Sequence, residues 1–211
     1  MMPPAPRNRS RAITLLPHVP PTHEGPRGKP VTRRTVLSRR DALSDEVRAR
    51  SSLQIAERVK DLLVQQTVVA LYAPIGSEAD TAQIDADARS LGLRVVYPRI
   101  VAGDRELAFH EVSPSQLTLA GFGLREPRVD APRVALPEIT AFVIPGLAFD
   151  RSGGRIGWGR GHYDATLAAA PRALRIGVAF ECQVLEYVPR DPHDALLHVV
   201  ATEVATYRTP A

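Results

Sequence analysis

The spacing of hydrophobic positions changes repeatedly between a helical and a strand-like period after residue 28. Between residues 44 and 63, apolar side chains recur every three or four positions, which predicts an amphipathic helix with one packed face. The hydroxyl of Ser44 is suited to cap this helix, with Asp45 and Glu46 near the positive end of its dipole. The apolar stripe consists of Val47, Leu53, Ile55, Val59, Leu62 and Leu63.

Short apolar runs bounded by turn residues predict strands that alternate with helices. We expect strands at residues 67–75, 93–98, 106–112 (half-buried, because apolar and polar positions alternate), 141–146, 174–180 and 198–207. Further helices are expected at residues 31–43, 77–92 (ending at Gly92), 162–170 and 181–188, and a loop at 117–127. This alternation predicts a single three-layer, Rossmann-like α/β domain, with a largely parallel sheet covered by helices on both faces.

Residues 1–28 differ in composition from the rest of the chain. Prolines interrupt this segment and no apolar period is sustained, so we expect a disordered Pro/Arg-rich N-terminal extension. It lacks the apolar centre of a secretory signal, and its prolines disfavour the amphipathic helix of a transit peptide. The α/β domain is then expected to span residues 29–211.

Overall composition excludes several classes of protein. The 211 residues are 44% hydrophobic and 24% charged, as in soluble globular domains. The sequence has no apolar run of the roughly 18 residues that a membrane span needs. The one cysteine, Cys182, excludes an internal disulfide framework and a cysteine-cluster zinc site, and it favours a cytoplasmic protein. We expect Cys182 to be a small buried side chain rather than a nucleophile.

The positive charge of the chain comes almost entirely from arginine. The net charge is +4, and Lys29 and Lys60 are the only lysines. Arginine forms paired hydrogen bonds with phosphate, so the balance fits a small polyanionic ligand, although genomic composition alone could also explain it. The sequence lacks the aromatic-rich basic pattern of single-strand binders, so we expect no nucleic-acid partner.

The stretch PGLAFDRSGGRIGWGRGHYD (residues 145–164) follows a predicted strand and carries the clearest sign of chemistry. Its glycines allow close approach of the backbone, whose N–H groups can bind phosphate oxygens near the helix that begins at His162. Arg155 and Arg160 can bind phosphates, and Asp164 is suited to magnesium. The alternative is a flexible surface turn. The spacing matches neither the dinucleotide fingerprint nor the Walker loop.

Three further stretches are ambiguous when taken alone. Residues 72–81 (YAPIGSEADT) follow a predicted strand and place Glu78 and Asp80 either at a ligand site or as simple helix caps. Lys29 and Arg33 share one helical face, which is also common on a solvated surface. Residues 189–198 form either a polar cluster at a site or an ordinary loop. Their polar side chains include Asp191, His193, Asp194 and His198.

Together these stretches resemble the 5-formyltetrahydrofolate cyclo-ligase family, also called methenyltetrahydrofolate synthetases, over residues 29–203. Residues 145–164 are similar almost letter for letter to the family signature P-G-x-x-F-D-x-x-G-x-R-x-G-x-G-x-G-x-Y-D. The supporting segments follow in the family's order: KPVTR, YAPIGSEADT, YPRI, GLREP and VPRDPHD…TE.

The resemblance implies an ATP- and magnesium-dependent ring closure of 5-formyltetrahydrofolate to 5,10-methenyltetrahydrofolate, with release of ADP and phosphate. A formamide carbonyl is a poor electrophile, so its oxygen must first become a leaving group, which transfer of the γ-phosphoryl group achieves. Catalysis then consists mainly of positioning and charge stabilisation, and no side-chain nucleophile is needed. The expected partner is this small-molecule substrate, and no membrane partner is expected. A monomer is the default expectation for the chain.

The resemblance also implies roles for individual residues. Lys29 and Arg155 would be catalytic, and Asp164 and Asp194 would hold magnesium. Glu78 would accept hydrogen bonds from the amino and imino groups of the pterin. The implied ATP-binding set is Lys29, Arg33, Arg155, Ile156, Gly157, Trp158, Gly159, Arg160, Gly161, His162 and Tyr163. The implied folate-binding set is Ala73, Glu78, Trp158 and Tyr163.

The chain departs from the family pattern at four positions. Thr32 replaces the usual leucine, and His162 replaces a common tyrosine. His198 stands where many members have an acid, which makes Asp194 more important to the metal site. Pro30 cannot donate a backbone hydrogen bond, so we expect the helix at Lys29 to begin later than usual.

Two other functions are compatible with the sequence. The first is a non-catalytic homologue that binds a nucleotide or folate and acts through RNA or a protein partner. The joint presence of Lys29, Glu78, Arg155 and Asp164 argues against it. The second is a sugar-phosphate isomerase with a similar fold and no ATP requirement, but the glycine loop and its arginines exceed what one phosphate needs.

Overall fold

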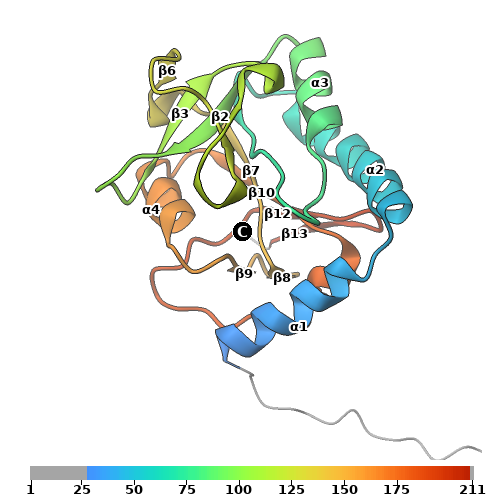
Figure 1. The fold of residues 1–211 in the computed structure, drawn as a ribbon. Helices are drawn as coiled ribbons and strands as arrows, with labels where there is room; N and C mark the ends of the chain where they lie inside the picture. Colours follow the sequence, from blue (N-terminus) through green and yellow to red (C-terminus); the bar gives the residue numbers. More distant parts are fainter. Residues whose placement is uncertain (1–27, 210–211) are drawn as a thin grey trace, which may run out of the picture.

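The computed structural model describes residues 28–209, so the predicted extension lies outside the described residues except for Gly28 (Figure 1). Its centre is an eight-stranded sheet with the order β13-β12-β10-β7-β1-β2-β3-β6. The strands are β1 (Val68–Ala70), β2 (Arg94–Ile100), β3 (Leu107–Glu111), β6 (Arg133–Val134), β7 (Ala141–Ile144), β10 (Leu174–Val178), β12 (Val199–Ala201) and β13 (Thr206–Arg208). The pairs from β12 to β2 are parallel, whereas β13, β3 and β6 are added antiparallel.

Helices cover both faces of this sheet, which confirms the predicted three-layer α/β fold (Figure 1). The helices α2 (Asp45–Leu63) and α3 (Ala82–Ser90) pack on one face, and α4 (His162–Ala169) packs on the other. Successive strand residues alternate between the layers, so Val69 joins the α2 side while Val68 joins the α4 side. None of the helices within residues 28–209 has the length and apolar character that a bilayer crossing requires.

Local signals at the helix ends are largely confirmed. The Ser44 hydroxyl accepts the backbone N–H of Val47, and Gly92 adopts a φ of 78° at the end of α3. The expectation of a delayed first helix is wrong, because α1 (Lys29–Asp41) begins at Lys29. Pro30 lies in the first turn, where no intrahelical N–H is needed. Leu53 is exposed rather than part of the packed stripe.

A small second sheet was not predicted. It consists of β11 (Val184–Leu185), β8 (Ala148–Asp150) and β9 (Arg155–Ile156), with β8 central. The helix expected at residues 181–188 is instead a 3₁₀ turn followed by β11. The buried amide of Gln183 explains this difference, because it donates to the carbonyls of Gly146 and Leu147 and so ties the turn to β8.

Two other predicted elements are interrupted by side chains that bind the backbone. The hydroxyl of Thr202 accepts the N–H groups of Val204 and Ala205, which turns the expected strand at residues 198–207 into the β12–β13 hairpin. Asp80 accepts the N–H of Ala82, so the helix predicted from residue 77 begins only at Ala82.

The remaining differences concern strand length and burial. The strand expected at residues 67–75 is paired as β1 only over Val68–Ala70. Residues 107–110 of β3 are all buried, because β3 lies inside the sheet between β2 and β6 and against α4, so the expected alternation is wrong. The predicted loop at 117–127 contains a short hairpin of β4 (Thr118–Leu119) and β5 (Arg125–Glu126).

The carboxylate of Asp150 joins two loops at the edge of the small sheet. This fully buried side chain accepts the backbone N–H groups of Ser152 and Gly154 from its own loop. It also accepts the N–H of Val188 and pairs with Arg190 at 2.9 Å. Burial alone would raise the pKa of Asp150, but Arg190 and the N–H donors hold it below its usual range.

Replacing Asp150 with Asn tests this junction. We expect the free energy of unfolding to fall by about 3 kcal/mol. The side-chain amide of the new asparagine would place an N–H donor against the N–H groups that Asp150 accepts, and Arg190 would lose its carboxylate partner. The measurement is urea unfolding at neutral pH, where the midpoint should fall with an unchanged slope.

Asp130→Asn is the matched control, because Asp130 is an exposed aspartate paired with Arg128 and should leave the midpoint unchanged. The pKa of Asp150 is lowered, so its stabilisation is present at neutral pH and is lost as pH falls through the folded-state pKa. The difference in the free energy of unfolding between wild type and Asp150→Asn should therefore become smaller at acidic pH. Equal midpoints for all three proteins at neutral pH would contradict this account.

Candidate active site

A cavity of about 650 Å³ lies beyond the carboxyl ends of β1 and β7, where parallel α/β sheets commonly bind ligands. It is lined from α1, from the segment after β1, from β2, from the β4–β5 hairpin, from residues 155–164 and from residues 191–194. All the site residues expected from the sequence line this one cavity: Lys29, Arg33, Ala73, Glu78, each residue from Arg155 to Asp164, and Asp194.

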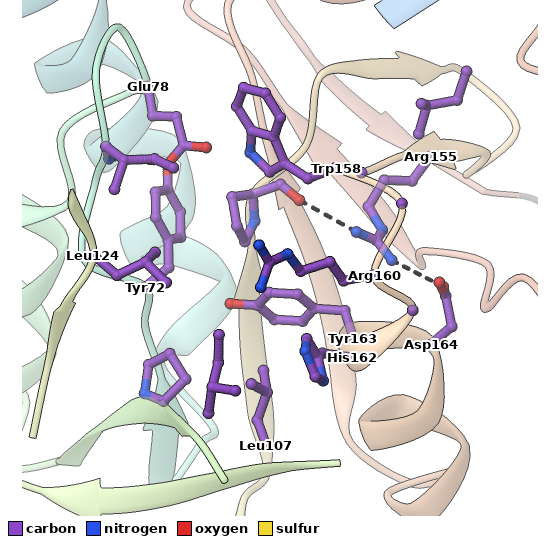
Figure 2. A pocket seen from close by; sticks show the side chains of 18 of the residues that line it. Tyr72, Glu78, Leu107, Leu124, Arg155, Trp158, Arg160, His162, Tyr163 and Asp164 are labelled. Carbon is purple, nitrogen blue, oxygen red and sulfur yellow. Dashed lines mark hydrogen bonds and ion pairs between the residues drawn. The ribbon is translucent and has the colours of Figure 1, made fainter. Parts of the chain in front are cut away.

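The cavity also has an apolar wall that the sequence analysis did not identify. It comprises Ile75, Pro98, Ile100, Leu107 and Leu124, two of which are visible in Figure 2. Strand residues such as Ile100 and Leu107 give the same sequence signal whether they face the core or a ligand. No pattern within the sequence distinguishes the two environments.

The glycine loop from Gly157 to Gly161 lies against α1. Arg33 donates from Nε to the carbonyl of Gly157 at 2.9 Å. Gly159 has a φ of 93°, and a Cβ added there would lie 3.0 Å from Nη2 of Arg33. Gly161 adopts a φ of 73° and serves as the N-cap of α4, so the loop leads directly into a helix N-terminus. Glycine is thus required both for the backbone turn and for the approach of Arg33.

Arg155 lies under this loop and forms a buried ion pair. Its side chain is 5% exposed, and Nη2 is 2.9 Å from Oδ1 of Asp164 (Figure 2). The guanidinium also stacks over the ring of Tyr163, 5.5 Å from its centroid. Burial raises the pKa of Tyr163, although the Arg155 charge opposes this. Nε of Arg155 is buried without a hydrogen-bond partner within residues 28–209, which leaves one donor to satisfy at the cavity.

Acidic side chains gather at the same end of the cavity. The Lys29 ammonium lies 2.6 Å from Asp191 and 2.7 Å from Asp194. Asp191, His193 and Asp194 offer ligand atoms within 4.8 Å of one another. Asp164 is adjacent, because its Oδ1 lies 3.4 Å from the backbone nitrogen of Ala195. Oxygen donors of this kind suit magnesium, and the Lys29 ammonium lies between two of them as a cation would.

Ion pairing shifts the pKa values of both partners. Partial burial favours the neutral form of each, but the Asp191 and Asp194 carboxylates raise the pKa of Lys29 overall. Lys29 and the N–H of Asp191 likewise hold the pKa of Asp194 below its usual range. Both groups are therefore charged at neutral pH. His198 lies apart from the cavity lining, and its Nδ1 accepts the N–H of Arg175.

The opposite end of the cavity contains Glu78 beside the apolar wall. Its side chain is buried, and Oε2 accepts the N–H of Ile75 at 3.1 Å. Burial raises the pKa of Glu78. Trp158 extends toward Glu78 from the glycine loop and is 50% exposed (Figure 2). A flat ring that carries N–H donors fits between such an apolar wall and a buried carboxylate.

The cavity therefore has two chemically different ends. The end formed by Lys29, Arg33, Arg155 and the glycine N–H groups suits a polyphosphate, with carboxylates nearby for a divalent cation. The Glu78 end suits an aromatic hydrogen-bond donor. One cavity can thus hold a nucleotide and a second, flat substrate next to each other.

Known proteins of one family have sequences similar to this chain. A model of the 5-formyltetrahydrofolate cyclo-ligase family matches residues 26–203. The 5-formyltetrahydrofolate cyclo-ligase of Mycolicibacterium smegmatis is 33% identical, covering 83% of this chain and 94% of its own. The enzyme of the same name from Escherichia coli K12 is 30% identical over 79% of this chain and 96% of its own.

Solved structures agree with the sequence comparisons. The 5,10-methenyltetrahydrofolate synthetase of Aquifex aeolicus superposes with a TM-score of 0.76 at 33% identity, covering 87% of this chain and 93% of that chain. The synthetase of Mycoplasma pneumoniae has a TM-score of 0.70 at 23% identity, covering 84% of this chain and 99% of that chain, and it supports the fold alone.

Gly159→Ala tests the contact between the glycine loop and α1. The new methyl group would displace Arg33, and loss of one charge-assisted hydrogen bond should weaken ATP binding by about tenfold or more. The measurement is isothermal titration calorimetry with ATP and magnesium.

Gly103→Ala is the matched control, because Gly103 has a similar φ of 91° but open space around its Cβ position. Both variants should lose about 1 kcal/mol of stability from backbone strain, and only Gly159→Ala should lose ATP affinity. Equal ATP affinities in the two variants would show that the contact between Gly159 and Arg33 does not contribute to nucleotide binding.

Proposed function

The chain belongs to the 5-formyltetrahydrofolate cyclo-ligase family and cyclises 5-formyltetrahydrofolate to 5,10-methenyltetrahydrofolate, and we propose that the cavity described above performs this reaction with ATP and magnesium. The curated relatives are named as cyclo-ligases, which leaves the non-catalytic alternative without support. The observation that carries the proposal is the joining of a cationic, glycine-lined end and a carboxylate-lined apolar end in one cavity.

Each end accepts one of the two substrates. Arg33 and Arg155 bind the ATP phosphates together with N–H groups of the glycine loop, and Lys29 joins them. Glu78 accepts hydrogen bonds from the pterin's amino and imino groups, while the wall that contains Leu107 and Leu124 excludes water. The formyl group then lies between the ends, within reach of the terminal phosphate.

The chemical problem is the poor leaving ability of the formyl oxygen. Attack of this oxygen on the γ-phosphorus forms a C–O–P bond and releases ADP. Nitrogen 10 of the folate then attacks the activated carbon and loses its proton, and the C–O bond breaks to expel inorganic phosphate, which takes up that proton. Lys29 and Arg155 stabilise the charge that moves through the phosphoryl oxygens, and no covalent bond to the protein is needed.

Asp164 and Asp194 are the proposed magnesium ligands, with Asp191 and His193 beside them. Magnesium bound there would neutralise phosphate charge and orient the ATP oxygens. Lys29 and Arg155 already neutralise these carboxylates, and both lie at the proposed phosphate site. With magnesium held there, Lys29 and Arg155 would be able to exchange their carboxylate partners for phosphate oxygens without leaving any charge unpaired.

Asp194→Asn tests the metal assignment directly. We expect the magnesium concentration for half-maximal activity to rise by about tenfold or more, because one anionic ligand becomes neutral. The assay follows the near-ultraviolet absorbance of the methenyl product at saturating ATP and folate, with a reaction lacking ATP as the baseline.

Asp61→Asn is the control, because Asp61 is an exposed aspartate on α2 away from the cavity, and it should behave like wild type. No ATP-dependent product from the wild-type protein would overturn the proposed reaction. An unchanged magnesium requirement in Asp194→Asn would overturn only the metal assignment.

A further inference from the structure

Arg40, near the C-terminal end of α1, lies at the folate end of the cavity. Arg40 is 2% exposed, which is rare for this side chain unless it has partners. Its Nε donates to Oγ of Ser77 at 2.9 Å, and its Nη1 lies 4.0 Å from Oε1 of Glu78. The hydroxyl of Ser77 in turn donates to Asp41. Arg40 is therefore fixed in place by the residue that precedes Glu78.

We propose that Arg40 is a positioning residue that keeps the Glu78 carboxylate ionised and oriented for the folate ring. The inference rests on the proposed role of Glu78 as the acceptor for that ring. Arg40 lies outside the cavity lining, so it acts through Glu78 rather than on a substrate. It adds a second function to α1, whose first turns carry Lys29 and Arg33.

The surroundings of Glu78 explain why it needs this cation. Burial favours the protonated carboxyl and raises the pKa of Glu78, while the N–H of Ile75, the Arg40 charge and the Trp158 indole oppose that rise. The phenols of Tyr72 and Tyr163 also face this carboxylate.

Burial raises the pKa of each phenol further above neutrality, so both keep their protons through the range in which a carboxyl titrates. Among the groups that act on the Glu78 carboxylate, Arg40 carries the positive charge. Its removal would therefore favour protonation of Glu78.

The protonation state decides which ligand Glu78 can bind. An ionised carboxylate accepts hydrogen bonds at both oxygens, whereas a protonated carboxyl presents one donor. The pterin's amino and imino groups are both donors, so the O–H of a protonated Glu78 would lie against one of these donors and could not accept its hydrogen bond. Each increase in the pKa of Glu78 thus reduces the fraction of enzyme that binds folate at a given pH.

The position of Arg40 also links the two ends of the site. Arg40 lies eleven residues after Lys29 on one helix, a separation of about 16 Å at 1.5 Å per residue. The same rigid element thus holds a cation at the phosphate end and a cation behind the folate carboxylate. α1 sets the distance between the two subsites.

The test compares Arg40→Met, Arg40→Lys and Glu78→Gln with wild type in the methenyl assay from pH 5.5 to 8.5. Arg40→Met should raise the folate KM by about tenfold on the acidic side of the limb, with a smaller rise at neutral pH, and leave the ATP KM within about twofold. The acidic limb of kcat/KM for folate should move up by about one pH unit or more, because loss of the cation raises the pKa of Glu78. In Arg40→Lys the acidic limb should lie close to its wild-type pH.

A double-mutant cycle separates positioning from a structural role. Glu78→Gln should remove the acidic limb, and adding Arg40→Met to it should raise the folate KM by less than about twofold, because Arg40 acts through Glu78. An unmoved limb in Arg40→Met, or an equal rise in both KM values, would overturn the inference.

If Arg40→Met does not fold, Ser77→Ala takes its place, because it removes the Nε anchor and keeps the charge. A smaller upward movement of the limb is then expected, and an unmoved limb overturns the inference. Failure of the wild-type enzyme to form product would instead refute the proposed function, so the two failures are distinguishable.

Discussion

The buried carboxylate of Asp150 is the constraint on which the cavity depends. It binds the turn between β8 and β9 and, with Arg190, the chain just before the acidic residues at the cavity. These two loops are distant in the sequence and have little regular structure of their own. The shared anion, together with the bond from the Leu197 N–H to the Gly153 carbonyl, fixes the glycine loop relative to the carboxylates near Asp194. The set of bonds to the buried Asp150 carboxylate provides specificity here, not merely stability.

Opposite charges are paired throughout the site. Lys29 lies between Asp191 and Asp194, Arg155 pairs with Asp164, and Arg40 lies behind Glu78. Lys29 and Arg155 therefore each have a carboxylate within the protein, so an anion that binds them must compete with that carboxylate or bring a metal ion that replaces the cation. Such exchange favours ATP with magnesium over ATP alone. The proposed requirement for both then has a common electrostatic origin.

Local signals predicted the parts of the fold that depend on short-range interactions. The Ser44 cap, the Gly92 stop and the buried parallel strands follow from residues within one turn or one strand. The small sheet was missed because its strands are very short and depend on the distant contacts of Gln183 and Asp150. The residues expected at the site came from the family resemblance, through residues 145–164 and the supporting segments that contain Lys29, Glu78 and Asp194. Arg40 was missed because an arginine at a helix end usually faces solvent.

Transfer of the γ-phosphoryl group to the formyl oxygen is the central chemical claim, and an isotope experiment tests it most directly. The wild-type enzyme is given ATP, magnesium and 5-formyltetrahydrofolate carrying ¹⁸O in its formyl group, in unlabelled water. The released inorganic phosphate is then analysed by mass spectrometry. The account predicts one ¹⁸O atom in each phosphate released. Unlabelled phosphate, with the label recovered in water, would show that ATP hydrolysis and ring closure are separate events.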